Sequence, residues 1–172
     1  MNFNYMAAGS RHGWYERGTF FFLISLDLQQ FKDDEFVVAD GLVRKIAEQP
    51  ADLEILAGRL TCQHSLFLDV QMKLDTTVRG GRIWVRLRTR QYHAGVLGKH
   101  PRPIFRYDNS HPYPGHPDAF HKHQFDPATW EQPDWPVWIG RENWPSLGDV
   151  LEELRQWWEV TGSHLDLTKG EA

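Results

Sequence analysis

Cysteine is almost absent from this sequence, in which Cys62 is the single example among 172 residues. One cysteine excludes an intrachain disulfide and a cysteine-rich zinc site. Long apolar runs are lacking as well, because the longest, residues 20–24, falls far short of the roughly 20 residues that span a bilayer as a helix. No basic region followed by a long apolar stretch opens the chain. We therefore expect a cytoplasmic protein without membrane contact.

Acidic residues are missing between Thr76 and Tyr107, although the chain as a whole carries a net charge of −4. The negative charge is concentrated in residues 131–153. This asymmetry predicts a basic side on an otherwise acidic molecule, while the net charge argues against nucleic-acid binding by the whole surface. The acid-free window contains eight basic residues: Arg79, Arg82, Arg86, Arg88, Arg90, Lys99, Arg102 and Arg106.

The length and composition predict one domain. A chain of 172 residues with 41% hydrophobic and 13% aromatic side chains is large enough to bury a substantial core. The first residues show no apolar period and mix Gly, Ser and Asn. We expect a flexible leader over residues 1–18, a single domain over residues 19–165 and a flexible tail over residues 166–172.

Alternating apolar and polar residues predict a β-hairpin in the middle of the chain. Residues 66–74 alternate, and residues 82–92 alternate again after a glycine-containing turn. Residues 20–28 are rich in β-formers, and residues 103–108 begin with a proline that a strand start tolerates, so both are predicted strands. In the second hairpin strand, alternation places these side chains together on the solvent face: Arg82, Trp84, Arg86, Arg88, Arg90 and Tyr92.

Two helices are predicted to flank these strands. The first would begin at Asp33, follow a roughly helical apolar stripe and stop at Pro50. The second would begin after Ser146, which forms a capping box with Asp149, and would pack its apolar face on the sheet. The predicted fold class is α+β, with an antiparallel sheet of about four strands, a preceding helix and a C-terminal amphipathic helix.

The arginine-rich face of the hairpin is a candidate RNA-binding surface. Guanidinium groups bind phosphates, and aromatic rings stack on unpaired bases. An ordinary solvated face remains the alternative, because Asp69 and Asp75 on the neighbouring strand are able to pair with these arginines across the sheet. The candidate RNA-binding residues are Arg86, Arg88, Arg90, Arg106, Trp84 and Tyr92.

Histidines gather in residues 107–123, which we interpret first as a metal-independent catalytic site. In a strand, His121 and His123 would point to the same side and act as general acid and base near neutral pH. Tyr107 and Asp108 would orient the imidazoles. Phosphate would be bound by Arg88, Arg90 and Arg106. This arrangement predicts an endoribonuclease that needs no cofactor.

The same histidines also suit a divalent transition metal. His111, His116, His121 and His123 are the candidate ligands, and Asp108 is a further one. A metal-dependent hydrolase is therefore the alternative to the endoribonuclease. A third reading is a non-catalytic interaction module, in which the histidines are simply exposed in a proline-rich loop and the tryptophans contact a partner.

A family resemblance rests on the run Phe105-Arg106-Tyr107-Asp108-Asn109, followed by histidines and His121-Lys122-His123. This pattern resembles the TumE-type toxins of bacterial toxin–antitoxin pairs, over roughly residues 66–158. The resemblance implies an intracellular protein that acts on RNA or the translation machinery and is silenced by a cognate antitoxin protein; a homo-oligomer is compatible with it. The chain departs from the pattern in residues 1–63 and in a tryptophan-rich stretch before the last helix.

Overall fold

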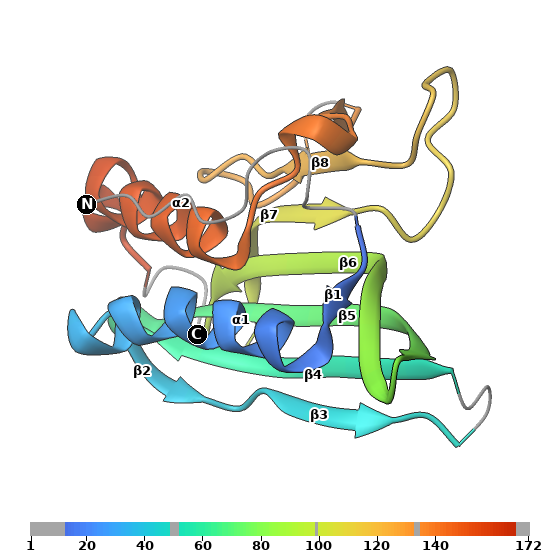
Figure 1. The fold of residues 1–172 in the computed structure, drawn as a ribbon. Helices are drawn as coiled ribbons and strands as arrows, with labels where there is room; N and C mark the ends of the chain where they lie inside the picture. The colour runs from blue at the N-terminus through green and yellow to red at the C-terminus, as the bar shows by residue number, and fades with distance from the viewer. Residues whose placement is uncertain (1–12, 49–51, 99, 133–134, 168–172) are drawn as a thin grey trace.

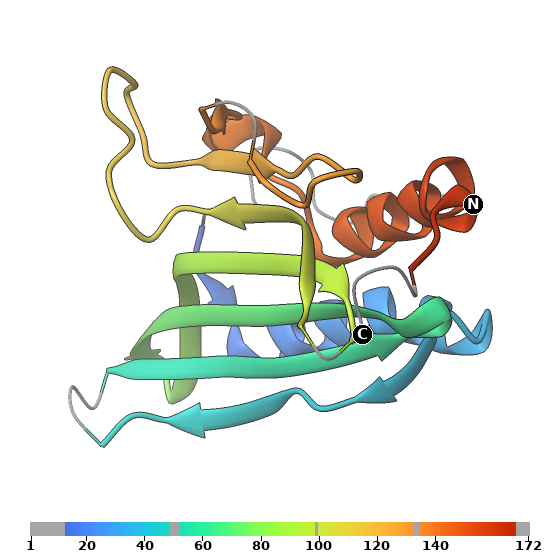
Figure 2. The same ribbon diagram turned by 180° about the vertical axis from the view of Figure 1, so that it is seen from behind.

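An antiparallel sheet dominates the computed structural model, which describes residues 13–48, 52–98, 100–132 and 135–167. Both α-helices lie against one face of this sheet, as Figure 1 shows. Seen from behind in Figure 2, the opposite face is not covered by a helix in the described part of the chain. We call it the bare face. Most of the predicted leader, residues 1–12, and most of the tail, residues 168–172, lie outside the described residues.

Five strands form the body of the sheet, in the order β4-β5-β6-β7-β8. The predicted hairpin is present as β5 (Leu66–Arg79) and β6 (Arg82–Val96). On one side β5 pairs with β4 (Leu53–Cys62). On the other side β6 pairs with β7 (Arg102–Asp108), close to the predicted strand, and β7 pairs with β8 (His121–Gln124).

Four short strands bring the sheet to nine, so the prediction of about four strands is wrong. Two of them pair with β4 along the edge opposite β5. The connection between these two contains Gly41, where a Cβ atom would lie 2.8 Å from the Arg59 carbonyl oxygen. Their apolar residues recur with a spacing that imitates a helix, which explains the mistaken helix over residues 33–50. The short strands are β1 (Tyr15–Glu16) on β6, β2 (Val37–Asp40) and β3 (Val43–Ile46) on β4, and β9 (Val137–Trp138) on β8.

Helix α1 (Arg17–Asp33) occupies the segment predicted to be the first strand, so that prediction is also wrong. The residues it buries against the sheet are Phe20, Ile24, Leu28 and Phe31, which recur every three or four positions as helix packing requires. Their β-forming character was misleading, because packing of a periodic apolar face outweighs intrinsic propensity.

Helix α2 (Leu147–Val160) confirms the predicted C-terminal amphipathic helix. The Ser146 hydroxyl accepts a hydrogen bond from the Asp149 amide, and the Asp149 carboxylate accepts one from the Ser146 amide, which completes the capping box. Short 3-10 turns occur at Gln63–Ser65, Arg141–Asn143 and Gly162–His164. None of the helices in the described ranges is long and apolar enough to cross a membrane.

A β-bulge in β6 reverses the direction of its side chains. Leu74 pairs with Leu87 but Lys73 pairs with Thr89, so Arg88 is an extra residue on β6. Up to Leu87 the alternation runs as predicted, and beyond the bulge every side chain changes face. Consequently the side chains predicted to be exposed are buried toward the helices: Arg90 is 6% exposed and Tyr92 is 0% exposed.

We expect Ser146→Ala to reduce the free energy of unfolding by about 1 kcal/mol, because the substitution leaves the amide at the start of α2 without its capping acceptor. Urea unfolding followed by far-UV circular dichroism measures the change. Ser25→Ala is the matched control, because the Ser25 hydroxyl bonds the Phe22 carbonyl oxygen within α1 and caps nothing. Equal effects from the two substitutions would contradict the assigned role of the capping box.

A candidate metal centre

The histidine-rich segment folds as a hairpin near one edge of the sheet. Asp108 at the end of β7 pairs directly with His121 at the start of β8, and residues 109–120 connect them. Cross-strand partners point to the same side of a sheet. Arg106 and His123, the next pair on that side, therefore share the bare face with Asp108 and His121.

Asp108, His111 and His121 form the tightest group of potential ligands, which we call the ligand trio. One donor atom from each lies within 4.8 Å of the other two. Asp108 and His121 are buried, with 3% and 0% of their surface exposed, whereas His111 is exposed. The trio thus lies at the boundary between protein and solvent, with His111 on the outer side.

The outer atom of each trio residue is held by a local hydrogen bond. Asp108 Oδ1 accepts from the amide and hydroxyl of Ser110, both at 2.7 Å. His111 Nδ1 lies 3.2 Å from the Pro112 carbonyl oxygen, and His121 Nδ1 lies 2.7 Å from that of Ala119. Because a carbonyl oxygen only accepts, both Nδ1 atoms carry the proton, which leaves both Nε2 lone pairs available.

The remaining donor atoms of the trio have few protein partners. His111 Nε2 lies 3.6 Å from Asp108 Oδ2, and the rings of His111 and His121 have centroids 4.8 Å apart. His121 Nε2 is buried and has no hydrogen-bond partner in the described part of the chain. A buried polar atom without a partner costs about 1–3 kcal/mol. Such an atom in a group that includes a carboxylate and a second imidazole indicates a candidate ligand site.

The electrostatics favour a neutral His121 imidazole beside an ionised Asp108 carboxylate. Burial lowers the pKa of His121, and the Ala119 hydrogen bond only partly opposes it. Burial alone would raise the pKa of Asp108, but hydrogen bonds from Ser110 outweigh it and the pKa is lowered. Neutral histidine and ionised aspartate are the forms in which these side chains bind metal ions.

A stack of rings supports the trio from the side. Tyr113 stacks on His121 with centroids 4.9 Å apart, and His116 stacks on Tyr113 at the same distance. Trp138 of β9 continues the stack beyond His116 at 5.2 Å. His116, one of the four histidines predicted as ligands, therefore holds the loop in place and lies outside the trio.

His123 lies beside His121, with ring centroids 5.0 Å apart, as the strand alternation predicted. Its Nδ1 lies 2.7 Å from the amide oxygen of Gln132, and its Nε2 lies 3.0 Å from Nη2 of Arg106. Burial lowers the pKa of His123, and the Gln132 hydrogen bond partly opposes this. Because a guanidinium group only donates, it occupies the Nε2 lone pair that a general base would need.

Tyr107 points to the opposite face and does not orient the imidazoles, contrary to its predicted role. Its hydroxyl donates to Glu153 of α2 at 2.6 Å, and Lys122 of β8 binds the second oxygen of the same carboxylate. Burial, followed by this hydrogen bond, raises the pKa of Tyr107 far above its usual range. Glu153 therefore links α2 to β7 and β8.

The candidate RNA-binding residues do not form one surface. Arg86 and Arg88 both pair with Asp75, at 2.9 and 2.5 Å, as the alternative of cross-strand charge pairing predicted. Beyond the bulge, the side chains of Arg90 and Tyr92 are buried on the face that the helices cover. Trp84 is half-buried. Of the six, Arg106 alone belongs to the surroundings of the trio, with Nη2 3.8 Å from Asp108 Oδ2.

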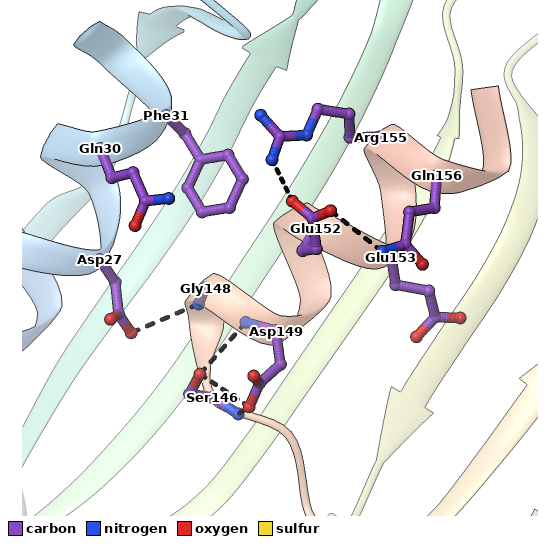
Figure 3. Close-up of a pocket in the computed structure, with 10 residues that line it drawn as sticks. All are labelled: Asp27, Gln30, Phe31, Ser146, Gly148, Asp149, Glu152, Glu153, Arg155 and Gln156. Carbon is purple, nitrogen blue, oxygen red and sulfur yellow. Dashed lines mark hydrogen bonds and ion pairs between the residues drawn. The ribbon is translucent and has the colours of Figure 1, made fainter. Parts of the chain in front are cut away.

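Away from the trio, a pocket of about 490 Å³ lies between α1 and α2. Figure 3 shows that several carboxylate side chains line it. These groups already have structural partners. Asp27 accepts from the Gly148 amide, Glu152 binds Arg155, and Asp149 caps α2. We therefore interpret this pocket as the structural interface between α1 and α2, where hydrogen bonds hold α2 in position.

Sequence reasoning named His111, His121 and Asp108 among several possible ligands but did not select them as a set. It missed the groups that orient the two histidines, which are the backbone carbonyls of Pro112 and Ala119. No residue-type signal marks a backbone acceptor, so only the loop geometry reveals these contacts. Comparisons with protein-family models, curated proteins and solved structures found no match.

We expect Glu153→Ala to lower the free energy of unfolding by about 1–3 kcal/mol, because it leaves the nearly buried Lys122 ammonium and the Tyr107 hydroxyl without their acceptor. Glu152→Ala is the matched control on the neighbouring residue, whose partly exposed ion pair with Arg155 is expected to contribute less than about 1 kcal/mol. Chemical denaturation compares the two variants. A loss no larger for Glu153→Ala than for Glu152→Ala would refute the linking role of Glu153.

Proposed function

We propose that this protein is a metal-dependent hydrolase whose divalent transition-metal ion is bound by Asp108, His111 and His121. The observation that carries the proposal is the grouping of one donor atom from each of these three side chains within 4.8 Å of one another. Within this group the Nε2 atom of His121 is buried and has no hydrogen-bond partner among the described residues. Two imidazoles and one carboxylate form a ligand set used by zinc and by non-haem iron.

The orientation of the three side chains supports the same proposal. Histidine ligands in metal sites commonly donate their second ring N–H to a carbonyl or carboxylate, which fixes the tautomer and the ring plane. His111 and His121 both have such a partner, and Ser110 holds the outer oxygen of Asp108. These contacts restrict the orientation of the three side chains, which supports the proposal.

The exposed position of His111 supports catalysis over a purely structural role. Structural zinc ions usually have four protein ligands, whereas catalytic ions have three and keep at least one position open to water or substrate. The trio supplies three ligands and borders solvent at His111. An ion bound there would activate water for attack on an ester or similar bond.

A metal-free mechanism that uses His121 and His123 as base and acid has less support. Arg106 occupies the lone pair of His123, and His121 is 0% exposed. The segment that resembles TumE-type toxins is the same hairpin that carries the trio, so the proposed chemistry uses the residues on which that resemblance rests.

We expect the protein to bind one Zn²⁺ or Co²⁺ ion per chain, and His111→Ala and His121→Ala to weaken binding by more than the roughly 10–100-fold typical of an outer contact. Isothermal titration measures the affinity, and visible absorption of Co²⁺ reports its coordination. His116→Ala is the matched control, because His116 is an exposed histidine of the same loop outside the trio. Absence of saturable binding, or equal losses in His111→Ala and His116→Ala, would refute the proposal.

A further inference from the structure

We propose that the substrate of this site is a phosphate ester, with its charged group between the ligand trio and Arg106 and its organic part in a groove across the bare face. This inference rests on the proposed metal site and adds the class of substrate. Four features of the described residues support it: a polar row, a groove, the unused donors of Arg106 and the charge of the bare face.

A continuous row of polar side chains crosses five strands of the bare face. Successive cross-strand pairs join Arg59 of β4 to Asp69 of β5, Asp69 to His93 of β6, His93 to Arg106 of β7, and Arg106 to His123 of β8. Directly opposed residues lie about 4.5–5.5 Å apart at their Cβ atoms. The row therefore leads from the far side of the sheet to the pair beside the trio.

A groove of about 480 Å³ follows this row and falls within the size range of small-molecule sites, about 300–1,000 Å³. Its floor includes the small residues Ala57 and Gly58, which leave room above the strands. The polar groups that line it are Arg59, Asp69, Gln71, Gln91, His93 and Arg106. Amide, guanidinium and imidazole groups along one hollow suit a ligand with several hydrogen-bonding atoms.

The two arginines of the groove differ in what they already bind. Arg59 forms two hydrogen bonds with the Asp69 carboxylate, at 2.6 and 2.8 Å, and stacks over Phe67 at 4.1 Å. Arg106 instead donates one hydrogen bond to the imidazole of His123, and its Nε atom is buried without a partner in the described ranges. Its guanidinium thus retains donors and positive charge next to the trio.

A phosphate group fits this arrangement better than a neutral ester. Its non-bridging oxygens allow one to face a metal ion while another accepts hydrogen bonds from a guanidinium. A carbonyl ester has a single neutral oxygen at the reacting centre and would leave the Arg106 charge unused. Asp108, 3.8 Å from Arg106, supplies one negative charge, which does not neutralise both a divalent ion and the arginine.

The wider bare face would also attract an anion. Arg86 and Arg88 share a single carboxylate, that of Asp75, so this cluster keeps a net positive charge. Surface charge of one sign raises the local concentration of oppositely charged ligands. Arg86 and Arg88 do not line the groove, so any attraction they exert on an anion acts from outside it.

The proposed reaction is the addition of water to phosphorus. The water oxygen forms a bond to phosphorus, and the ester P–O bond breaks with its electron pair leaving on the organic oxygen. One proton of the water stays on the new phosphate hydroxyl, and the other ends on the leaving oxygen. Arg106 would stabilise the negative charge on the non-bridging oxygens during this step.

The test uses metal-loaded protein and three chromogenic probes: bis(4-nitrophenyl) phosphate, 4-nitrophenyl phosphate and 4-nitrophenyl acetate. We expect turnover of at least one phosphate ester, and the choice between them separates a diester from a monoester source. Arg106→Gln is expected to reduce that turnover by roughly 100-fold or more and to weaken binding of inorganic phosphate. Acetate hydrolysis should fall much less than phosphate-ester turnover, because the acetate ester carries no charge for Arg106 to bind.

Arg88→Gln is the matched control, because it removes an arginine of the bare face outside the groove. Arg106→Lys keeps the charge without the fork of donors and should be intermediate, which guards against a folding defect in Arg106→Gln. Normal metal binding with no phosphate-ester turnover, or equal rates in Arg106→Gln and Arg88→Gln, would overturn this inference alone. Failure to bind metal would instead overturn the proposed function.

Discussion

The extra residue at Arg88 determines which face of the sheet the side chains in the second half of β6 occupy. One residue inserted into β6 reverses the faces of everything that follows, so Tyr92 enters the core and Gln91 and His93 reach the bare face. Strands β7 and β8 pair with this second half of β6. Asp108 pairs with Gln91 of β6, and His121 pairs with Asp108. Because the bulge places Gln91 on the bare face, Asp108 and His121 lie on the bare face as well.

Local signals in the sequence predicted the elements that stabilise themselves locally. The hairpin of β5 and β6 follows from two alternating segments around a tight turn, and α2 follows from Ser146 and its apolar stripe. The short strands were missed because they have too few residues for a pattern and form only by pairing with β4, β6 or β8. The bulge carries no glycine or proline signal, so the faces beyond it were assigned wrongly.

The candidate site shows the same limit. Strand alternation was enough to place His121 beside His123, since both belong to one element. It could not reveal which imidazole keeps a lone pair, because that depends on Ala119 in the loop and on Arg106 across the strand. The choice of His111 over His116 likewise depends on how the loop between β7 and β8 is folded, with His116 held between Tyr113 and Trp138.

The position of the hairpin near one edge of the sheet has a consequence for how an ion would be loaded. The three proposed ligands belong to β7, to β8 and to the loop that joins them, and among the described residues the sheet continues beyond β8 as the two residues of β9. Terminal strands open with less free energy than central ones. Rapid exchange of the bound ion with the surroundings would therefore require only fraying of this hairpin, while the hydrophobic core under α1 and α2 stays closed.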